Sequence, residues 1–515
     1  MYIGWFAGVV TLIYLLATLI IMGLMKLPLK PAPILAAVVC GIICLLVPIQ
    51  MGSQTWDDHD RSGRYTCTDF GQNYLMTLQQ EGAPIIFTNG DNDTFPLWYN
   101  QDTEGVRTDA RVCNLSYLNT DWYIDQMKRP AYDSPAVPIH WSRLEYCSGT
   151  NEYVKVDRHI RSAIELLRKQ YPAEVKELFG EDPYELKNVL KYWVRDHRSD
   201  ELKQRQKAAI ELAYNQIEEI KNDYYYELES DLHVIPTDTV YLTIDKEAVR
   251  KSGMKIQGDS IPDRMVISLK GLGGLDKSKL MMLELLANAN WTRPIYVAYT
   301  VGQENYMNLG DNFVQEGLAN RITPFTTNID DQPLPHMTNF DTEKTYDNVM
   351  NRYKFGGIDK PGIYLDETVM RMCYTHRRLM VKLATNLIDE GDNDKAAKVL
   401  EKCDKEIPSY NVPHDFQSGS IDMARCYAKL GNTKKAKEVL EALWKNSDQS
   451  MTFYNSLPPY LFPSCTSSSQ FHMFYVMRHL IDIASSCDMN LAEQYDQKLG
   501  EHIDTYLSKG GPLPQ

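Results

Sequence analysis

The sequence predicts a two-helix membrane hairpin, then an α/β domain with parallel strands and a helical insertion, and finally an all-α repeat domain. Three observations carry this prediction. Two uncharged apolar runs lie within residues 1–53, strand–helix units follow one another from Pro84 onward, and the motif at 394–401 recurs at 434–441. A chain of 515 residues is also too long for a single ordinary core, so several domains are expected.

The membrane hairpin is predicted from the two apolar runs. Ile3–Met25 and Ala32–Met51 are each long enough to span a bilayer as a helix. Lys26 and Lys30 are the only charges near the ends of these runs, so the positive-inside rule places the turn between them in the cytoplasm. We therefore expect a multi-pass protein whose residues from about Gln54 onward lie outside the membrane.

The α/β domain is predicted over residues 54–330 and begins with two strand–helix units. Pro84–Thr88 is a short β-branched and aromatic run bounded by turn residues, as is typical of a buried strand, and Ala110–Leu115 is predicted as a second strand. Polar residues and a predicted helix follow each run. Successive strand–helix units indicate parallel strands covered by helices, and ligands of such sheets bind beyond the carboxyl ends of the strands.

The rest of this domain is predicted to return to the same sheet after an insertion. Residues at about 158–230 show the period and charge pattern of helices, with an uninterrupted helical run expected over 184–229. Strands are then predicted over 239–244, 264–269 and 293–299, with a helix over 277–288 before the last one.

A tetratricopeptide-like helical domain is predicted over residues 365–515, after a linker at 331–364. Its motif Asp394–Glu401 recurs as Lys434–Glu441, with a spacing that suits a pair of stacked helices. Further helices around 471–485 and 491–507 are expected to complete the stack. The matched positions hold glycines, which suit the turns of such a stack, and small or apolar residues, which suit its buried inner face. The pairs are Gly391 and Gly431, Ala396 and Ala436, Val399 and Val439, Leu400 and Leu440.

The candidate ligand site lies where the first two strands end. Its residues are Asn89, Asp91, Asn92, Asp93, Trp98 and Asp121. Carboxylates accept hydrogen bonds from sugar hydroxyls or coordinate a divalent cation, and an aromatic ring stacks on a pyranose. The same carboxylates would repel phosphate, so a carbohydrate or an acceptor peptide is expected instead of a nucleotide. The alternative is that Asp91 and Asp93 cap helices and close turns while Trp98 fills the core.

Several function classes are excluded by composition and motifs. The net charge is −14 and no Lys/Arg-rich tract occurs, so nucleic acid is not an expected partner. No cofactor is evident, because the sequence contains no serine-hydrolase elbow, zinc-protease motif or dinucleotide fingerprint. Gly271–Ser278 is similar to a phosphate loop, but Asp276 replaces its second required glycine and is expected to cap the next helix instead.

Five segments in order give the chain a family resemblance: Trp56–Tyr65, Asn89–Trp98, Leu118–Ile124, Asn290–Tyr296 and Tyr364–Arg371. The chain resembles the C-terminal half of bacterial envelope proteins of domain-of-unknown-function family 2723, which is similar to transmembrane protein O-mannosyltransferases. The resemblance implies a lipid-sugar-dependent protein O-glycosyltransferase of the bacterial cytoplasmic membrane, with the large domain on the periplasmic side. It implies acceptor proteins and a polytopic transferase subunit as partners.

The resemblance carries over no catalytic residue. Transferases of this class place their catalytic carboxylate in an early extracytoplasmic loop, which precedes the region matched here. We therefore expect this chain to be non-catalytic alone and to assist acceptor recognition or core stability, as the product of a split or truncated gene. The alternative is an independent membrane-anchored scaffold that binds envelope proteins through its helical repeat.

Overall fold

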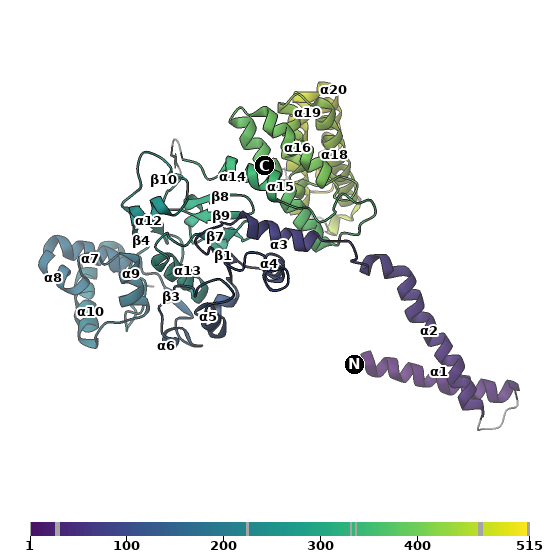
Figure 1. The fold of residues 1–515 in the computed structure, drawn as a ribbon, viewed down its shortest axis with the longest axis horizontal. Helices are drawn as coiled ribbons and strands as arrows, with labels where there is room; N and C mark the ends of the chain where they lie inside the picture. The colour runs from purple at the N-terminus through teal and green to yellow at the C-terminus, as the bar shows by residue number, and fades with distance from the viewer. Residues whose placement is uncertain are drawn as a thin grey trace. The chain divides into compact units, whose positions relative to one another are not determined.

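The computed structural model describes residues 2–25, 31–222, 226–329, 332–334, 337–461 and 467–511 (Figure 1). The chain divides into two compact units. One comprises Met1–Arg64 with Gly362–Tyr364, and the other comprises Tyr65–Pro361 with Leu365–Gln515.

The first unit contains the helices α1 (Tyr2–Met25) and α2 (Pro31–His59), which pack against each other. Within the described residues, the segment Ala36–Trp56 is long and apolar enough to cross a membrane, with a mean hydropathy of 2.1. The apolar segment found in α1, Thr11–Leu24, is shorter than a span. The turn that we expected at residues 26–30 lies outside the described residues.

A five-stranded sheet forms the centre of the second unit, in the order β2-β1-β7-β9-β8. β1 runs parallel to β2 and to β7, which confirms the predicted parallel core and the return of the chain to the same sheet. A hairpin that the sequence did not predict, β8–β9, extends the sheet antiparallel to β7. The strands are β1 (Ile85–Thr88), β2 (Arg111–Asn114), β7 (Ile295–Ala298), β8 (Phe313–Gln315) and β9 (Ala319–Ile322).

The predicted strands at 239–244 and 264–269 form as β4 (Thr239–Thr243) and β5 (Arg264–Ser268), but outside this sheet. They pair antiparallel with each other. Side chains of β4 and β5 alternate between buried and more exposed, whereas every residue of β1, β2 and β7 is buried. The alternation shows that the β4–β5 ribbon is covered on one face, as is common for antiparallel strands. The central parallel strands are covered on both faces. The other short pairs are β3 (Tyr153–Lys155) with β6 (Gly274–Asp276), and β10 (Asn328–Ile329) with β11 (Gln332–Pro333).

The helix predicted over 277–288 forms as α13 (Lys277–Asn288). Asp276 caps α13 as expected, because its Oδ1 accepts hydrogen bonds from the Lys279 backbone N–H at 3.0 Å and from Ser278 Oγ at 2.7 Å. The helices are α3 (Thr66–Thr77), α4 (Asp91–Asp102), α5 (Asp121–Met127), α6 (Arg143–Tyr146), α12 (Lys246–Lys251), α13 (Lys277–Asn288), and the 3-10 turns η1 (Tyr117–Asn119), η3 (Gln303–Asn305) and η4 (Leu309–Asn312).

The helical insertion has an apolar core of its own, formed by α7, α8, α10 and their connections. The single helical run expected over 184–229 is wrong: the chain turns at Asp196, whose φ is +57°, and Ser199 caps a new helix. The elements are α7 (Arg158–Gln170), α8 (Pro172–Phe179), α9 (Leu186–Asn188), η2 (Val189–Val194), α10 (Asp200–Tyr214) and α11 (Glu218–Lys221).

The segment 331–364, which we expected to be a linker, contains α14 (Thr342–Asp347) and the π-helical turn η5 (Asn348–Arg352). It buries Phe340, Val349 and Tyr353 in the core shared by the α/β and repeat regions. Apolar anchors at these positions attach the segment to the second unit, to which its residues up to Pro361 belong.

The C-terminal region is a stack of helix pairs, as predicted. α15, α17 and α19 lie next to one another, and each packs against the helix that follows it; α15 also packs against α3 and α14 (Figure 1). Ala396, Leu400, Ala436 and Leu440 are fully buried. The helices are α15 (Glu367–Asp389), α16 (Asn393–Glu406), α17 (Ser420–Lys429), α18 (Thr433–Ser456), α19 (Ser467–Cys487) and α20 (Met489–Ser508), with the 3-10 turns η6 (Phe416–Ser418) and η7 (Pro459–Leu461).

Candidate functional site

The carboxyl ends of three neighbouring parallel strands, β2, β1 and β7, place polar residues beside one another. Asn89 follows β1 and accepts a hydrogen bond through its Oδ1 from Ser116 Oγ, which follows β2, at 3.0 Å. Thr300 follows β7, and its Oγ1 donates to Asp93 Oδ2 at 2.9 Å. The structure thus brings the loop after β1 to the edge of the sheet where ligands of such folds bind.

Asp91, Asn92 and Asp93 do not form a separate polar turn, because α4 begins at Asp91. Gly90 occupies the N-cap position, and its backbone N–H donates to Asp93 Oδ1 at 2.9 Å. The helix can start directly at Asp91 because the Asp93 carboxylate in its first turn reaches back to this free N–H group. The capping alternative therefore describes Asp93, whereas the Asp91 side chain is exposed.

Asp93 is held in a buried chain of polar groups. Its side chain is 4% exposed, and Thr300 connects it to the Tyr74 hydroxyl, which lies 3.1 Å from Thr300 Oγ1. Burial raises the pKa of the Asp93 carboxyl above its usual value and raises the pKa of Tyr74 as well. The Asp93 carboxylate is thus held by two hydrogen-bond donors, the Gly90 N–H and the Thr300 hydroxyl, and the Tyr74 hydroxyl holds Thr300 in turn.

A cavity of about 710 Å³ opens above this loop. Asn89, Asn92, Asp93 and Thr300 line it from the α/β side, and Arg371 and Arg378 of α15 line it from the repeat. Glu304, in η3, adds a second carboxylate to the α/β side. The cavity therefore has a carboxylate-bearing wall opposite a wall with two guanidinium groups.

Two further cavities continue along α15. One of about 760 Å³ shares Arg378 and Gln417 with the first, and one of about 510 Å³ shares Tyr299 and Lys382 with the second. We call these three cavities together the α15 groove.

The second cavity of the α15 groove is basic although the chain as a whole is acidic. Arg378, Lys382, Arg425 and Lys429 line it together with Asp422. Arg425 pairs with Asp422, and Lys429 pairs with Asp389 at 3.2 Å.

Two of these cations are bonded to neutral groups. Lys382 Nζ donates to Gln315 Oε1 at 2.7 Å, and Arg378 Nη2 donates to Thr375 Oγ1 at 3.1 Å. Burial lowers the pKa of Lys382. Arg378 and Lys382 are therefore the cations of the groove best placed to meet an incoming anion.

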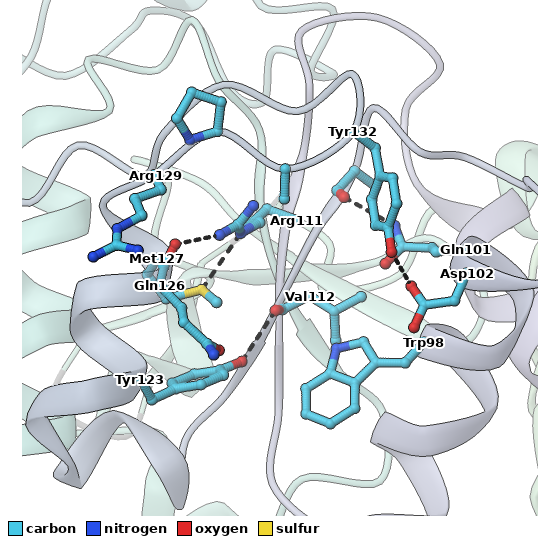
Figure 2. A pocket seen from close by; sticks show the side chains of 13 residues that line it. Trp98, Gln101, Asp102, Arg111, Val112, Tyr123, Gln126, Met127, Arg129 and Tyr132 are labelled. Atoms are coloured by element: carbon cyan, nitrogen blue, oxygen red, sulfur yellow. Dashed lines mark hydrogen bonds between the residues drawn. The ribbon is translucent and has the colours of Figure 1, made fainter.

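Trp98 and Asp121 lie away from the α15 groove. Trp98 lines a separate cavity of about 400 Å³ at the outer edge of β2, with Arg111, Tyr123 and Tyr132 (Figure 2). Asp121 is the first residue of α5 and pairs with Arg143 at 3.3 Å. Of the six residues singled out in the sequence, Asn89, Asn92 and Asp93 line the α15 groove and Trp98 lines this separate cavity. Asp91 and Asp121 line none of the four cavities described.

The residues missed by the sequence analysis carried a usable signal. Thr300 and Glu304 follow a predicted strand, as Asp91 and Asp93 do, so the same rule would have selected them. Arg371, Arg378 and Lys382 share one face of a predicted helix by their spacing, which is common for a solvated face and pointed to no partner.

A metal centre is not built in the part of the chain that the structure describes, where no three His, Cys, Asp or Glu side chains come together. A divalent cation bound jointly by the loop and a ligand stays a prediction.

Comparison with known proteins identifies both regions of the second unit. A family model described as TMEM260-associated domain 2 matches residues 67–344, which is more than half of the chain. A tetratricopeptide-repeat model matches residues 387–452, which confirms the predicted repeat. No curated protein and no solved structure matches the chain. The chain belongs to the family of proteins that carry a TMEM260-associated domain 2.

Proposed function

We propose that the chain is a membrane-anchored scaffold that holds an extended segment of a partner protein in the α15 groove. The observation that carries the proposal is the line of three cavities along α15, between the carboxyl edge of the sheet and the repeat. Helical repeats present concave surfaces of this kind to other proteins. An elongated groove fits an extended chain better than it fits a compact small molecule.

The charge of the groove favours a partner segment with carboxylate side chains. Arg378 and Lys382 offer donors that are bonded only to neutral groups, whereas Asp93 is committed to the helix start and to Thr300. A segment with carboxylates near Arg378 and polar or hydroxyl side chains near Asn89 and Asn92 would be complementary to both walls.

The finer role that we propose is assistance to a lipid-sugar-dependent protein O-glycosyltransferase. The resemblance to domain-of-unknown-function family 2723 supports it. In this role α1 and α2 form a membrane hairpin, the second unit lies in the periplasm, and the groove presents an acceptor protein to a polytopic transferase subunit. The chain itself supplies no catalytic group.

The groove can be tested by site-specific crosslinking in intact cells. A photoreactive amino acid at Gln417, which lines two of the cavities, should crosslink to one acid-rich peptide of an envelope protein. Charge reversal by Arg378→Glu should abolish this adduct, whereas Lys398→Glu on the exposed surface of α16 should leave it unchanged. A photoreactive group at Lys398 that captures the same peptide, or an adduct insensitive to Arg378→Glu, would contradict the proposal.

The glycosylation role needs a separate test. The captured protein should lose its O-linked sugar in cells that carry Arg378→Glu and keep it in cells that carry Lys398→Glu. The purified chain with a lipid-linked sugar donor should transfer no sugar. Transfer by the chain alone, abolished by a point substitution within it, would show that it is catalytic.

A further inference from the structure

The cavity at Trp98 is a second pocket, independent of the α15 groove. It lies beside β2, the edge strand of the sheet, and is enclosed by α4, α5 and the chain that follows α5. It shares no lining residue with the three cavities of the groove. Its volume of about 400 Å³ is near the lower end of the range for small-molecule sites. We call it the Trp98 pocket.

Aromatic rings form the walls of the Trp98 pocket, and their hydroxyls are already in use. The Tyr123 hydroxyl donates to Val112 O at 3.2 Å and accepts from the Asn114 backbone N–H at 2.9 Å. The Tyr132 hydroxyl donates to Asp102 Oδ1 at 2.5 Å. With these hydroxyls engaged, Trp98 and Tyr132 offer apolar ring surface to a ligand, while Tyr123 is buried beside them (Figure 2).

The pocket is also lined by a buried positive charge, that of Arg111, which no carboxylate of the described residues neutralises. Arg111 is 6% exposed; its Nη2 donates to Gln126 O at 2.7 Å, and its Nη1 is buried without a hydrogen-bond partner among the described residues. Arg293, also buried, bonds to backbone carbonyls and to Ser134 Oγ. Neither guanidinium forms an ion pair with a carboxylate in the described part of the chain, and the two repel each other.

An unpaired buried charge is costly, and its field is weakly screened inside the protein. An anion that enters the Trp98 pocket would supply the missing counter-charge. Arg129 adds an exposed guanidinium at the mouth of the pocket, where it makes no ion pair with a described residue. In Figure 2 the guanidinium groups of Arg111 and Arg129 lie across the pocket from the Trp98 ring.

The charge count favours a monoanion over a dianion. Asp102 lines the same pocket and, although hydrogen-bonded to Tyr132, remains a negative charge close to any ligand. A phosphate group, with a charge near −2, would meet this repulsion more strongly than a carboxylate.

We propose that the Trp98 pocket binds a carboxylate carried on a six-membered ring. The ring stacks on Trp98, and the carboxylate lies at the end formed by Arg111 and Arg129. Two ligand sources share this chemistry: a sugar acid, whose pyranose face packs on indole, and an aromatic acid. The pocket volume suits one such ring.

The proposal is tested with matched acids and neutral compounds on the full-length protein in detergent. Ligand-observed NMR measures binding of glucuronate against glucose and of benzoate against benzamide. At least one acid should bind about tenfold more tightly than its neutral counterpart, as expected for a charge-assisted hydrogen bond. The acid that binds better identifies the source. Equal binding of both acids and their neutral counterparts, or tighter binding of glucose 6-phosphate than of glucuronate, overturns the proposal.

Substitutions locate the binding within the Trp98 pocket. Arg129→Gln should weaken binding of the acid and leave binding of its neutral counterpart unchanged. Trp98→Leu should weaken binding of both compounds. The controls are Arg158→Gln and Tyr475→Leu, which remove an exposed guanidinium and an exposed ring elsewhere and should change nothing. Because Arg129 is exposed, its variant should fold. Acid binding that survives both Arg129→Gln and Trp98→Leu would overturn the proposal.

Discussion

The helical repeat and the loop Asn89–Asp93 lie in one compact unit but differ in how sequence relates to role. In the repeat, residues 40 positions apart do the same work. Gly391 and Gly431 end the first helix of each pair with φ values of +86° and +74°. Asp392 and Asn432 then cap the second helix, each accepting a hydrogen bond at 3.2 Å from the backbone N–H three residues later.

In the loop, neighbouring residues do different work. Asn89 ties β1 to the turn after β2, Asn92 lines the α15 groove, and Asp93 is buried as the brace of the helix start. Asp91, between them, is exposed. Residue type therefore predicts a residue's role where a structural unit recurs, because the same residue type at the equivalent position of the other copy supports the assignment. A segment that occurs once offers no such check.

The largest expected effect tests the equivalence within the repeat. Leu400→Ala and Leu440→Ala should each lower the free energy of unfolding by about 2–5 kcal/mol, because both side chains are fully buried between helices. Urea unfolding of the full chain measures both. A cost below about 0.5 kcal/mol for either leucine would show that its pair of helices is not packed as described.

A second test concerns the part of α15 that the repeat does not share. α17 begins at Ser420, so the part of α15 before Met380 has no α-helical counterpart; residues 376–378 correspond to the 3-10 turn η6. There His376 is buried against Phe70 and accepts a hydrogen bond from Asn73 Nδ2 at 2.9 Å through Nε2.

Burial lowers the pKa of His376 to about 3, so the folded protein keeps the imidazole neutral while the unfolded chain takes up a proton below about pH 6.5. Stability should therefore fall as the pH drops from about 6.5 toward 3, by about 3 kcal/mol at pH 4.5. The glutamine of His376→Gln can still accept the hydrogen bond from Asn73 Nδ2 but does not titrate. The substitution should therefore remove the part of the stability loss at low pH that comes from His376. An unchanged pH slope in unfolding of His376→Gln would refute the assignment.

Much of the fold was predictable because burial leaves a periodic pattern. The runs at 85–88 and 295–298 are mostly apolar, which suits strands covered on both faces, and Ala396 and Leu400 recur in register with Ala436 and Leu440. The hairpin β8–β9 was missed because Ala319–Ile322 contains Asn320 and Arg321, which read as exposed although both are buried.

The candidate site was predictable only in part. The edge of the sheet could be inferred from strand direction, which placed Asn89, Asn92 and Asp93 correctly at the carboxyl end of β1. The opposite wall, with Arg371 and Arg378, depends on how the repeat packs against α3, and no local pattern encodes that contact. Trp98 was grouped with the loop because it is close in sequence, whereas it lines the Trp98 pocket beside β2 and none of the cavities of the groove.

Within the loop, Asp93→Ala should have the larger effect. It removes the acceptor of the Gly90 N–H and of Thr300 Oγ1, at a cost of about 1–2 kcal/mol. Because burial raises the pKa of Asp93, the folded protein binds a proton there more tightly than the unfolded chain does. The contribution of Asp93 therefore decreases as the pH rises through its pKa, and the substitution should cost more near pH 4 than at pH 7. A cost that grows with pH would contradict this picture.

Asp91→Asn should have the smallest effect, although it removes the same charge two residues away. Its side chain is exposed and lines none of the cavities described here, so only its interaction with the N-terminus of α4 is lost, a few tenths of a kcal/mol. Crosslinking from Gln417 should also be unchanged, since the partner segment meets Asn89 and Asn92 instead. Thermal unfolding and the crosslinking yield are measured on the same variant. If stability is kept but the adduct is lost, Asp91 contacts the partner directly, and the loop binds the partner through its exposed carboxylate while its buried carboxylate holds the helix start.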